Sequence, residues 1–149
     1  MRKAGEFTYV FLFGCFLYSL LEIAARGYTH WSMTLTGGMC FAYIYHVTTE
    51  RKMHLILKCT AGAVFITAAE FFVGVYDNII MKWNVWDYSE MPANILGQIC
   101  LPFSCLWFLL CFAGCYLSRV INIRFINAYN RFNLYGSMII SSGTARIIG

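Results

Sequence analysis

The residues of this sequence most able to do chemistry are ionisable side chains inside otherwise apolar stretches. Glu22 and Arg26 are four residues apart, in the acid-before-base order that favours a pair on one helical face. Glu70 and Asp77 lie seven apart near the end of another apolar stretch, which places them on one face of a helix. A charged side chain costs at least about 2.5–3.5 kcal/mol at the centre of a membrane helix, so each is a candidate for a functional site.

Two interpretations of this group remain open. In the structural one, Arg26 pairs with a carboxylate, Asp87 orders a turn, and the tryptophans form a belt at the membrane interface. In the functional one, two carboxylates with one arginine leave a negative pocket walled by Trp31, Trp86 and Tyr88. Such a pocket suits a cation, a proton or an amine-bearing solute.

Other polar residues extend the candidate site. His30 could titrate near neutral pH, or could simply form a hydrogen bond at the interface beside Trp31. Pro102 predicts a kink that frees the carbonyl of Gln98, and Asn94 is placed to cap the following helix. No phosphate loop, nucleophile elbow or zinc motif is present, so the sequence predicts no catalytic residue, metal site or cofactor and argues against a familiar soluble enzyme.

The elements that position these residues are predicted to be membrane helices. The chain has 149 residues, of which 60% are hydrophobic and 12% charged, whereas soluble domains have roughly 25% charged residues. Its apolar runs are long enough to cross about 30 Å of hydrocarbon as helices. We therefore predict an all-α polytopic membrane protein, with a four-helix transmembrane domain over residues 1–121 and spans at about 7–25, 31–47, 55–75 and 95–121.

Residues 122–149 are predicted to form a cytoplasmic amphipathic tail. Arg124 and Arg131 are spaced seven apart with aromatic and aliphatic residues between them. This pattern is typical of an interfacial helix on an anionic leaflet.

Small and polar residues recur at spacings of three and four in the apolar runs, a pattern typical of helix interfaces in lipid. Two of the runs carry long stripes of this kind. One stripe can pack against the other helices of the same chain and the other against a second copy of the chain, so we expect a homo-oligomer. All seven cysteines fall inside the runs, without zinc spacing, and are expected to be reduced packing residues.

Charge predicts the orientation. If the spans alternate, nine of the eleven lysines and arginines lie on the side of the N-terminus: Arg2, Lys3, Arg51, Lys52, Lys58, Arg119, Arg124, Arg131 and Arg146. The positive-inside rule then places both termini in the cytoplasm and the protein in the cell (inner) membrane. The net charge of +4 indicates contact with anionic lipid rather than nucleic acid, because the basic residues flank the spans.

The sequence also resembles the bacterial family of small membrane proteins labelled ABC-transporter permeases of the CmpB type. The similar stretches cover about residues 20–107: Glu22 with Arg26-Gly27-Tyr28-Thr29-His30-Trp31, Gly37-Gly38, Glu70 with Gly74 and Asn78, Trp86-Asp87-Tyr88-Ser89, Pro92-x-Asn94, and Gly97-Gln98-Ile99-Cys100-Leu101-Pro102-Phe103-Ser104 followed by Trp107. The resemblance implies a transport-related function without naming a solute. It adds Asn78 to the candidate ligand-binding residues, which become Glu22, Arg26, His30, Trp31, Glu70, Asn78, Trp86, Asp87, Tyr88, Asn94 and Gln98.

Three functions are compatible with these observations. The leading hypothesis is a permease-like transport subunit with a polar site in its extracytoplasmic half; since the chain has no nucleotide-binding motif, a separate ATPase subunit would drive it. The second is a non-catalytic assembly or sensory protein that binds a partner through its outer loop. The third is an intramembrane enzyme that uses Glu22, Glu70 or Asp87 in acid–base chemistry.

Overall fold

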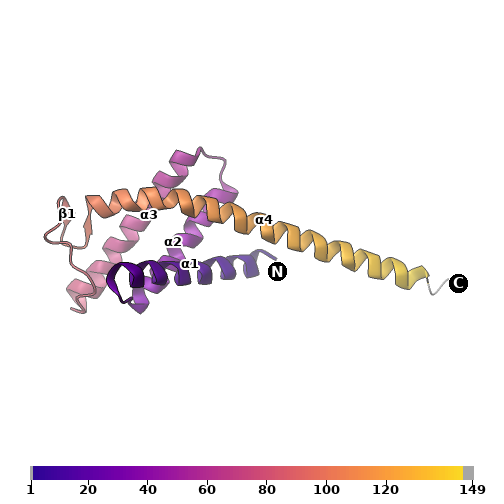
Figure 1. Ribbon diagram of the computed structural model, residues 1–149, viewed down its shortest axis with the longest axis horizontal. Coiled ribbons are helices and arrows are strands. Elements are labelled where there is room, and N and C mark those ends of the chain that lie inside the picture. The colour runs from indigo at the N-terminus through magenta and orange to yellow at the C-terminus, as the bar shows by residue number, and fades with distance from the viewer. Residues whose placement is uncertain (1, 146–149) are drawn as a thin grey trace.

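The computed structural model is all-helical apart from one two-residue strand pair, and it describes residues 2–145 (Figure 1). Four α-helices are joined by short connections, except that a π-helical turn and a long loop separate the third from the fourth. The elements are α1 (Arg2–Arg26), α2 (Trp31–Glu50), α3 (Leu55–Gly74), η1 (Val75–Ile80), β1 (Asn94–Ile95), β2 (Ile99–Cys100) and α4 (Leu101–Ala145). The antiparallel strand pair closes the end of the long loop against the start of α4.

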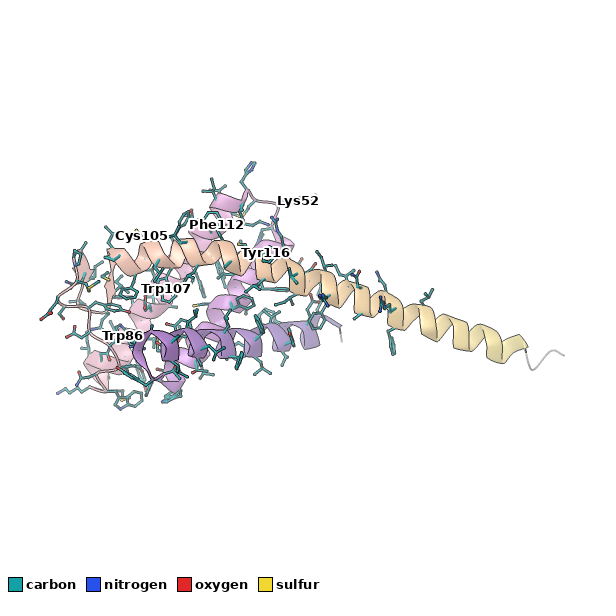
Figure 2. The ribbon with its side chains drawn as sticks, viewed as in Figure 1. Lys52, Trp86, Cys105, Trp107, Phe112 and Tyr116 are labelled. Carbon is teal, nitrogen blue, oxygen red and sulfur yellow. The ribbon has the colours of Figure 1, made fainter. Side chains whose placement is uncertain are left out.

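The bundle has two chemically different ends. At the first, which we call the loop end, residues 27–30 and 81–100 meet: Arg26 Nη1 and the Tyr28 hydroxyl both donate hydrogen bonds to the carbonyl of Val85, at 3.0 and 3.4 Å. At the other, the basic end, Lys3 Nζ lies 3.2 Å from Glu50 Oε1 and the 51–54 connection follows. Figure 2 shows Trp86 and Lys52 at these opposite ends.

Among the described residues, three segments are long and apolar enough to cross a membrane: Lys3–Arg26, Leu55–Ile80 and Leu101–Phe132. The predicted count of four spans is therefore not confirmed, because α2 is not among them. α2 is the helix that packs against α1, α3 and α4. A helix enclosed by protein can carry more small and polar side chains than one facing lipid, and the buried residues of α2 include Ser32, Thr36, Gly37, Gly38 and Thr48.

α1 and α2 approach closely where glycines face each other. A Cβ atom added to Gly14 would lie 2.6 Å from Phe41 Cβ and 3.0 Å from the carbonyl oxygen of Gly37. A Cβ atom on Gly38 would lie 2.8 Å from the ring of Phe11 and 2.9 Å from its carbonyl oxygen. The absence of side chains at these positions sets the distance between the two helices.

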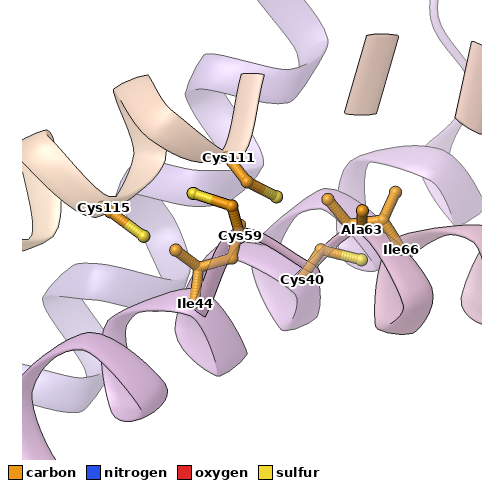
Figure 3. Packing of buried hydrophobic residues seen from close by; sticks show 7 residues of the cluster. All are labelled: Cys40, Ile44, Cys59, Ala63, Ile66, Cys111 and Cys115. Atoms are coloured by element: carbon orange, nitrogen blue, oxygen red, sulfur yellow. The ribbon is translucent and has the colours of Figure 1, made fainter. Parts of the chain in front are cut away.

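Cysteines fill the centre of the interface between α2, α3 and α4 (Figure 3). The buried cluster consists of Cys40, Ile44, Cys59, Ala63, Ile66, Cys111 and Cys115. All seven cysteines of the chain have free thiols, and Cys105 is the exposed one. In this cluster the thiols act as small apolar packing groups that let the three helices come together.

The start of α4 differs from the prediction. The sequence predicts a span from residue 95, with a kink at Pro102 and a cap at Asn94, but α4 begins at Leu101 and Asn94 lies in β1. Pro102 therefore occupies the first turn of the helix, where its missing N–H has no intrahelical partner to lose. It starts the helix instead of kinking it, and the carbonyl of Gln98 accepts a hydrogen bond from Trp86 Nε1 at 2.9 Å.

The end of α4 also differs from the prediction. The helix continues through Asn122 without a break as far as Ala145, so a separate interfacial helix is not confirmed. At 1.5 Å per residue its 45 residues extend over about 68 Å, more than twice the hydrocarbon thickness of a bilayer. Its C-terminal part extends away from the other helices (Figure 1). Residues 146–149 of the predicted tail lie outside the described residues.

Replacing Gly38 by Ala tests the close contact between α1 and α2. We expect Gly38→Ala to lower the free energy of unfolding by about 1–3 kcal/mol, because the backbone of α1 must move to admit the methyl group. Gly5→Ala is the matched control, since no atom lies within 4 Å of a Cβ at that position. Denaturant titration in detergent, followed by circular dichroism, measures both. Equal stability of the two variants would contradict this packing.

Candidate functional site

A cavity of about 550 Å³ lies at the loop end, between α1, α3, α4 and the loop. Six of the predicted site residues line it: Glu22, Arg26, Glu70, Trp86, Asp87 and Tyr88. Aromatic and apolar side chains complete the wall, among them Tyr18, Phe103 and Trp107. The structure therefore brings the ionisable groups of α1 and α3 to one place beneath the loop.

The carboxylate of Glu22 and the guanidinium of Arg26 form an ion pair in the wall of this cavity. Arg26 Nη2 donates to Glu22 Oε1, and Thr29 Oγ1 donates to Glu22 Oε2 at 2.6 Å. The other guanidinium nitrogen, Nη1, donates to the carbonyl of Val85. Arg26 thus joins the loop to α1 and neutralises one carboxylate.

Glu70 is buried without a positively charged partner. Its side chain is only 3% exposed, and it accepts hydrogen bonds from Trp107 Nε1 at 2.8 Å and from the Tyr88 hydroxyl at 3.4 Å. Both donors are neutral, and no lysine or arginine of the described part of the chain forms an ion pair with Glu70. A buried carboxylate without a counter-ion is costly, so this position favours the arrival of a positive charge or a proton.

Asp87 and Tyr88 form the roof of the cavity. Asp87 accepts hydrogen bonds from the side chain and the backbone N–H of Ser89, and these bonds lower the pKa of Asp87 below its ordinary value. The ring of Tyr88 stacks on Phe103 with centroids 4.7 Å apart. Burial raises the pKa of Tyr88 well above its ordinary value, so its hydroxyl keeps its proton and can donate to Glu70.

Asn78 and Gln98 hold the loop in place and do not line the cavity. Asn78 Nδ2 donates to Gln98 Oε1 at 2.8 Å, and Asn78 Oδ1 accepts from the backbone N–H of Val85 at 2.6 Å. Gly74 allows this arrangement, because a Cβ at its position would lie 2.7 Å from Gln98 Oε1 and 2.9 Å from the ring of Trp86.

Asn94 orders the end of the loop. Its Nδ2 donates to the carbonyls of Ser89 and Met91 at 3.0 and 2.9 Å, and its Oδ1 accepts from Gly97 N–H at 3.2 Å. Gly97 has a φ of +67°, a left-handed conformation that glycine adopts without strain. Asn94 therefore stabilises a turn instead of capping α4.

His30 and Trp31 lie outside the cavity. His30 Nδ1 is 2.6 Å from Ser32 Oγ, and its ring packs against Trp31 and Trp83 with centroids 5.7 and 5.2 Å away. The prediction that Trp31 walls the same pocket as Trp86 and Tyr88 is wrong, because Trp31 is 59% exposed and does not line the cavity. It and Trp83 form an edge-to-face pair on the surface, as in an interfacial belt.

Asp77 also lies away from Glu70, although seven-residue spacing predicts a shared face. α3 ends at Gly74, and the wider π-helical turn of η1 follows, which changes the direction of the next side chains. Asp77 is fully buried and accepts a hydrogen bond from Ser32 on α2, while its Oδ1 has no partner among the described residues. No group of three or more His, Cys, Asp or Glu side chains in the described part of the chain could hold a metal ion.

The structure adds residues to the site that the prediction did not include. Trp107 and Thr29 bind the two buried carboxylates directly, and Tyr18 stacks on Trp107 with centroids 5.9 Å apart. Thr29 and Trp107 both fall in the stretches that resemble the family. The four-residue spacing of Tyr18 and Glu22 was a usable signal, whereas helical spacing does not extend to Thr29, because α1 ends at Arg26.

Three helices long and apolar enough to cross a membrane, with a cavity of ionisable and aromatic residues at one end, are typical of a membrane protein. The family described as "Putative ABC-transporter type IV" has a sequence model that matches residues 9–145. The chain belongs to this family, which confirms the resemblance to CmpB-type proteins. No curated protein and no solved structure matches the chain.

Removing the amide of Asn78 tests whether it holds the loop. We expect Asn78→Ala to leave the N–H of Val85 and the amide of Gln98 without these partners, and to lower the local opening free energy by about 1–3 kcal/mol. Hydrogen exchange of peptides covering residues 81–100 measures this. Asn127→Ala, on an exposed part of α4, is the control. Unchanged exchange in the Asn78 variant would contradict the role of this residue.

Proposed function

We propose that this protein is a permease-like subunit of a membrane transporter and that the cavity at the loop end binds a positively charged or amine-bearing solute. The observation that carries the proposal is the charge of the cavity. Three carboxyl groups, those of Glu22, Glu70 and Asp87, line it together with the single guanidinium of Arg26. A partly enclosed site with this excess of carboxylates attracts cations.

The residues around Glu70 supply the specificity. A bound ammonium group can donate to the Glu70 carboxylate, and the aromatic side chains of Tyr18, Tyr88 and Trp107 line the same cavity, where aromatic rings favour cations. Arg26 remains bound to Glu22 and Val85, so it does not need to leave for the solute to enter.

The transport role requires partners. The chain has no nucleotide-binding motif, so a separate ATPase subunit supplies the energy, as the family's relation to ABC transporters suggests. A second copy of the chain completes the pathway, because four helices enclose little interior space. In this proposal α2 crosses the membrane together with the three more apolar helices, which places the loop end outside and both termini in the cytoplasm.

Replacing Glu70 by Gln tests the binding site. In lipid nanodiscs we expect the wild-type protein to bind butylamine and not butyrate, as measured by calorimetry. We expect Glu70→Gln to weaken butylamine binding at least about tenfold, because the amide keeps the hydrogen bonds to Trp107 and Tyr88 but loses the charge.

Two controls separate a binding site from a structural ion pair. Glu90→Gln removes the same charge from an exposed position of the loop outside the cavity and is expected to leave binding unchanged. Exchanging Glu22→Arg with Arg26→Glu keeps the net charge but moves each group away from Thr29 and Val85, so we expect a folded protein that no longer binds. Absence of butylamine binding to the wild-type protein, or equal effects at Glu70 and Glu90, would refute the proposed site.

Reporter fusions test the proposed topology. Because nine of eleven cations lie on one side of four alternating spans, we expect fusions at Glu50 and after Ser118 to report a cytoplasmic location, and one at Asp87 an external location. If the Glu50 fusion reads as external, α2 does not cross the membrane in the proposed direction.

A further inference from the structure

A second, apolar cavity adjoins the polar one. It has a volume of about 210 Å³ and lies between α1, α2 and α4, farther from the loop end than the Glu70 site. Its wall includes Gly14 and Leu17 of α1, Gly37 and Ile44 of α2, and Gly114 and Leu117 of α4. It is larger than the apolar cavity of about 150 Å³ that holds a benzene molecule in an engineered protein, so it can admit a hydrocarbon group.

The two cavities share part of their wall, and we call them together the slot: the cavity with the ionisable groups is its polar part and the other its apolar part. Tyr18, Leu21, Trp107 and Leu110 line both of them. Along α1 the lining changes from Gly14 through these shared residues to Glu22 and Arg26, and along α4 it runs in the opposite direction. A molecule that enters this slot therefore meets carboxylates at the loop end and only apolar groups below.

The slot opens between α1 and α4. Both helices pack against α2, whereas their contact with each other within the described residues is slight and is made by side chains, such as the pairs Tyr18–Trp107 and Tyr9–Phe125. Leu21 of α1 and Leu106 of α4 line the polar part and are 43% and 42% exposed on the surface of the bundle. In a membrane this surface contacts lipid, so the slot is accessible from the bilayer.

We infer that the ligand of this site is a membrane amphiphile with a protonated amine headgroup, which enters sideways between α1 and α4, placing its amine at Glu70 and its alkyl chain in the apolar cavity. This inference rests on the proposed function, to which it adds the class of ligand and the route of entry. An anionic amphiphile is repelled by Glu70 and Asp87, and a short hydrophilic amine leaves the apolar cavity unused. Each methylene group removed from water contributes about 0.8 kcal/mol, but transfer from lipid contributes much less, so the headgroup decides selectivity.

Photo-crosslinking in nanodiscs tests the inference. The probe is dodecylamine with a diazirine in its chain, and the matched control is the carboxylate of the same chain. We expect the amine probe to label residues 14–21 of α1 and 110–117 of α4, with the label reduced by excess butylamine and reduced about tenfold in Glu70→Gln. Equal labelling of these segments by the carboxylate would overturn the inference, because the slot would then hold any lipid chain.

A variant that fills the apolar cavity separates this inference from the proposed function. A Cβ at Gly114 would be in ordinary contact with Ile44, at 3.4–3.5 Å, so Gly114→Leu places its side chain in the cavity without a severe clash. We expect it to reduce chain labelling to the level of the carboxylate probe while butylamine still binds. Ala113→Leu serves if the first variant does not fold, and Ala128→Leu, on an exposed part of α4, is the control. If butylamine binds but Gly114→Leu and Ala113→Leu leave labelling by the amine probe unchanged, this inference alone fails. If butylamine does not bind the wild-type protein, the proposed function fails as well.

Discussion

The close contact between α1 and α2 at Gly14, Gly37 and Gly38 is the constraint on which the arrangement of the other helices depends. Because these positions lack side chains, α1 lies directly against α2 over the middle of its length. On the other side of α2, the small thiols of Cys40, Cys59 and Cys111 let α3 and α4 pack around it. With its neighbours fixed in this way, α2 keeps α1 and α4 apart, and the space between them becomes the slot with its polar and apolar parts.

The loop end illustrates how a membrane protein satisfies its buried polar groups. Arg26, Asn78, Gln98 and Asn94 each bond to backbone atoms of the loop, so the irregular segment between η1 and α4 has fixed partners without being helical. Glu70 differs from these residues, since it receives only neutral donors. A buried carboxylate that exists only to hold the fold would ordinarily have a counter-ion, and Glu70 forms no ion pair among the described residues.

The two buried acids of the third helical segment have separate environments. Glu70 faces α1 and α4, while Asp77 faces the start of α2 through Ser32, with His30 Nδ1 3.8 Å from its carboxylate. The π-helical turn between them accounts for this separation, and such turns are frequent at functional sites. The same π-helical turn directs Asn78 toward the loop, where it binds the N–H of Val85. One local irregularity therefore separates Asp77 from Glu70 and also positions the residue that holds the loop over the cavity.

The sequence by itself determined the helical class, the approximate positions of the first three helices, the Glu22–Arg26 pair and the gathering of carboxylates at one end, because apolar run length, four-residue spacing and charge distribution are local properties. It did not determine the start of α4, since a proline in an apolar run fits either a kink or a first turn, and only the pairing of β1 with β2 decides between them. Nor could it place Trp31 outside the cavity, or Asp77 on a different face from Glu70, because helical periodicity assumes regular turns and η1 is not regular. The slot between α1 and α4 was decided by tertiary structure alone, since a space between two helices depends on how closely each packs against a third.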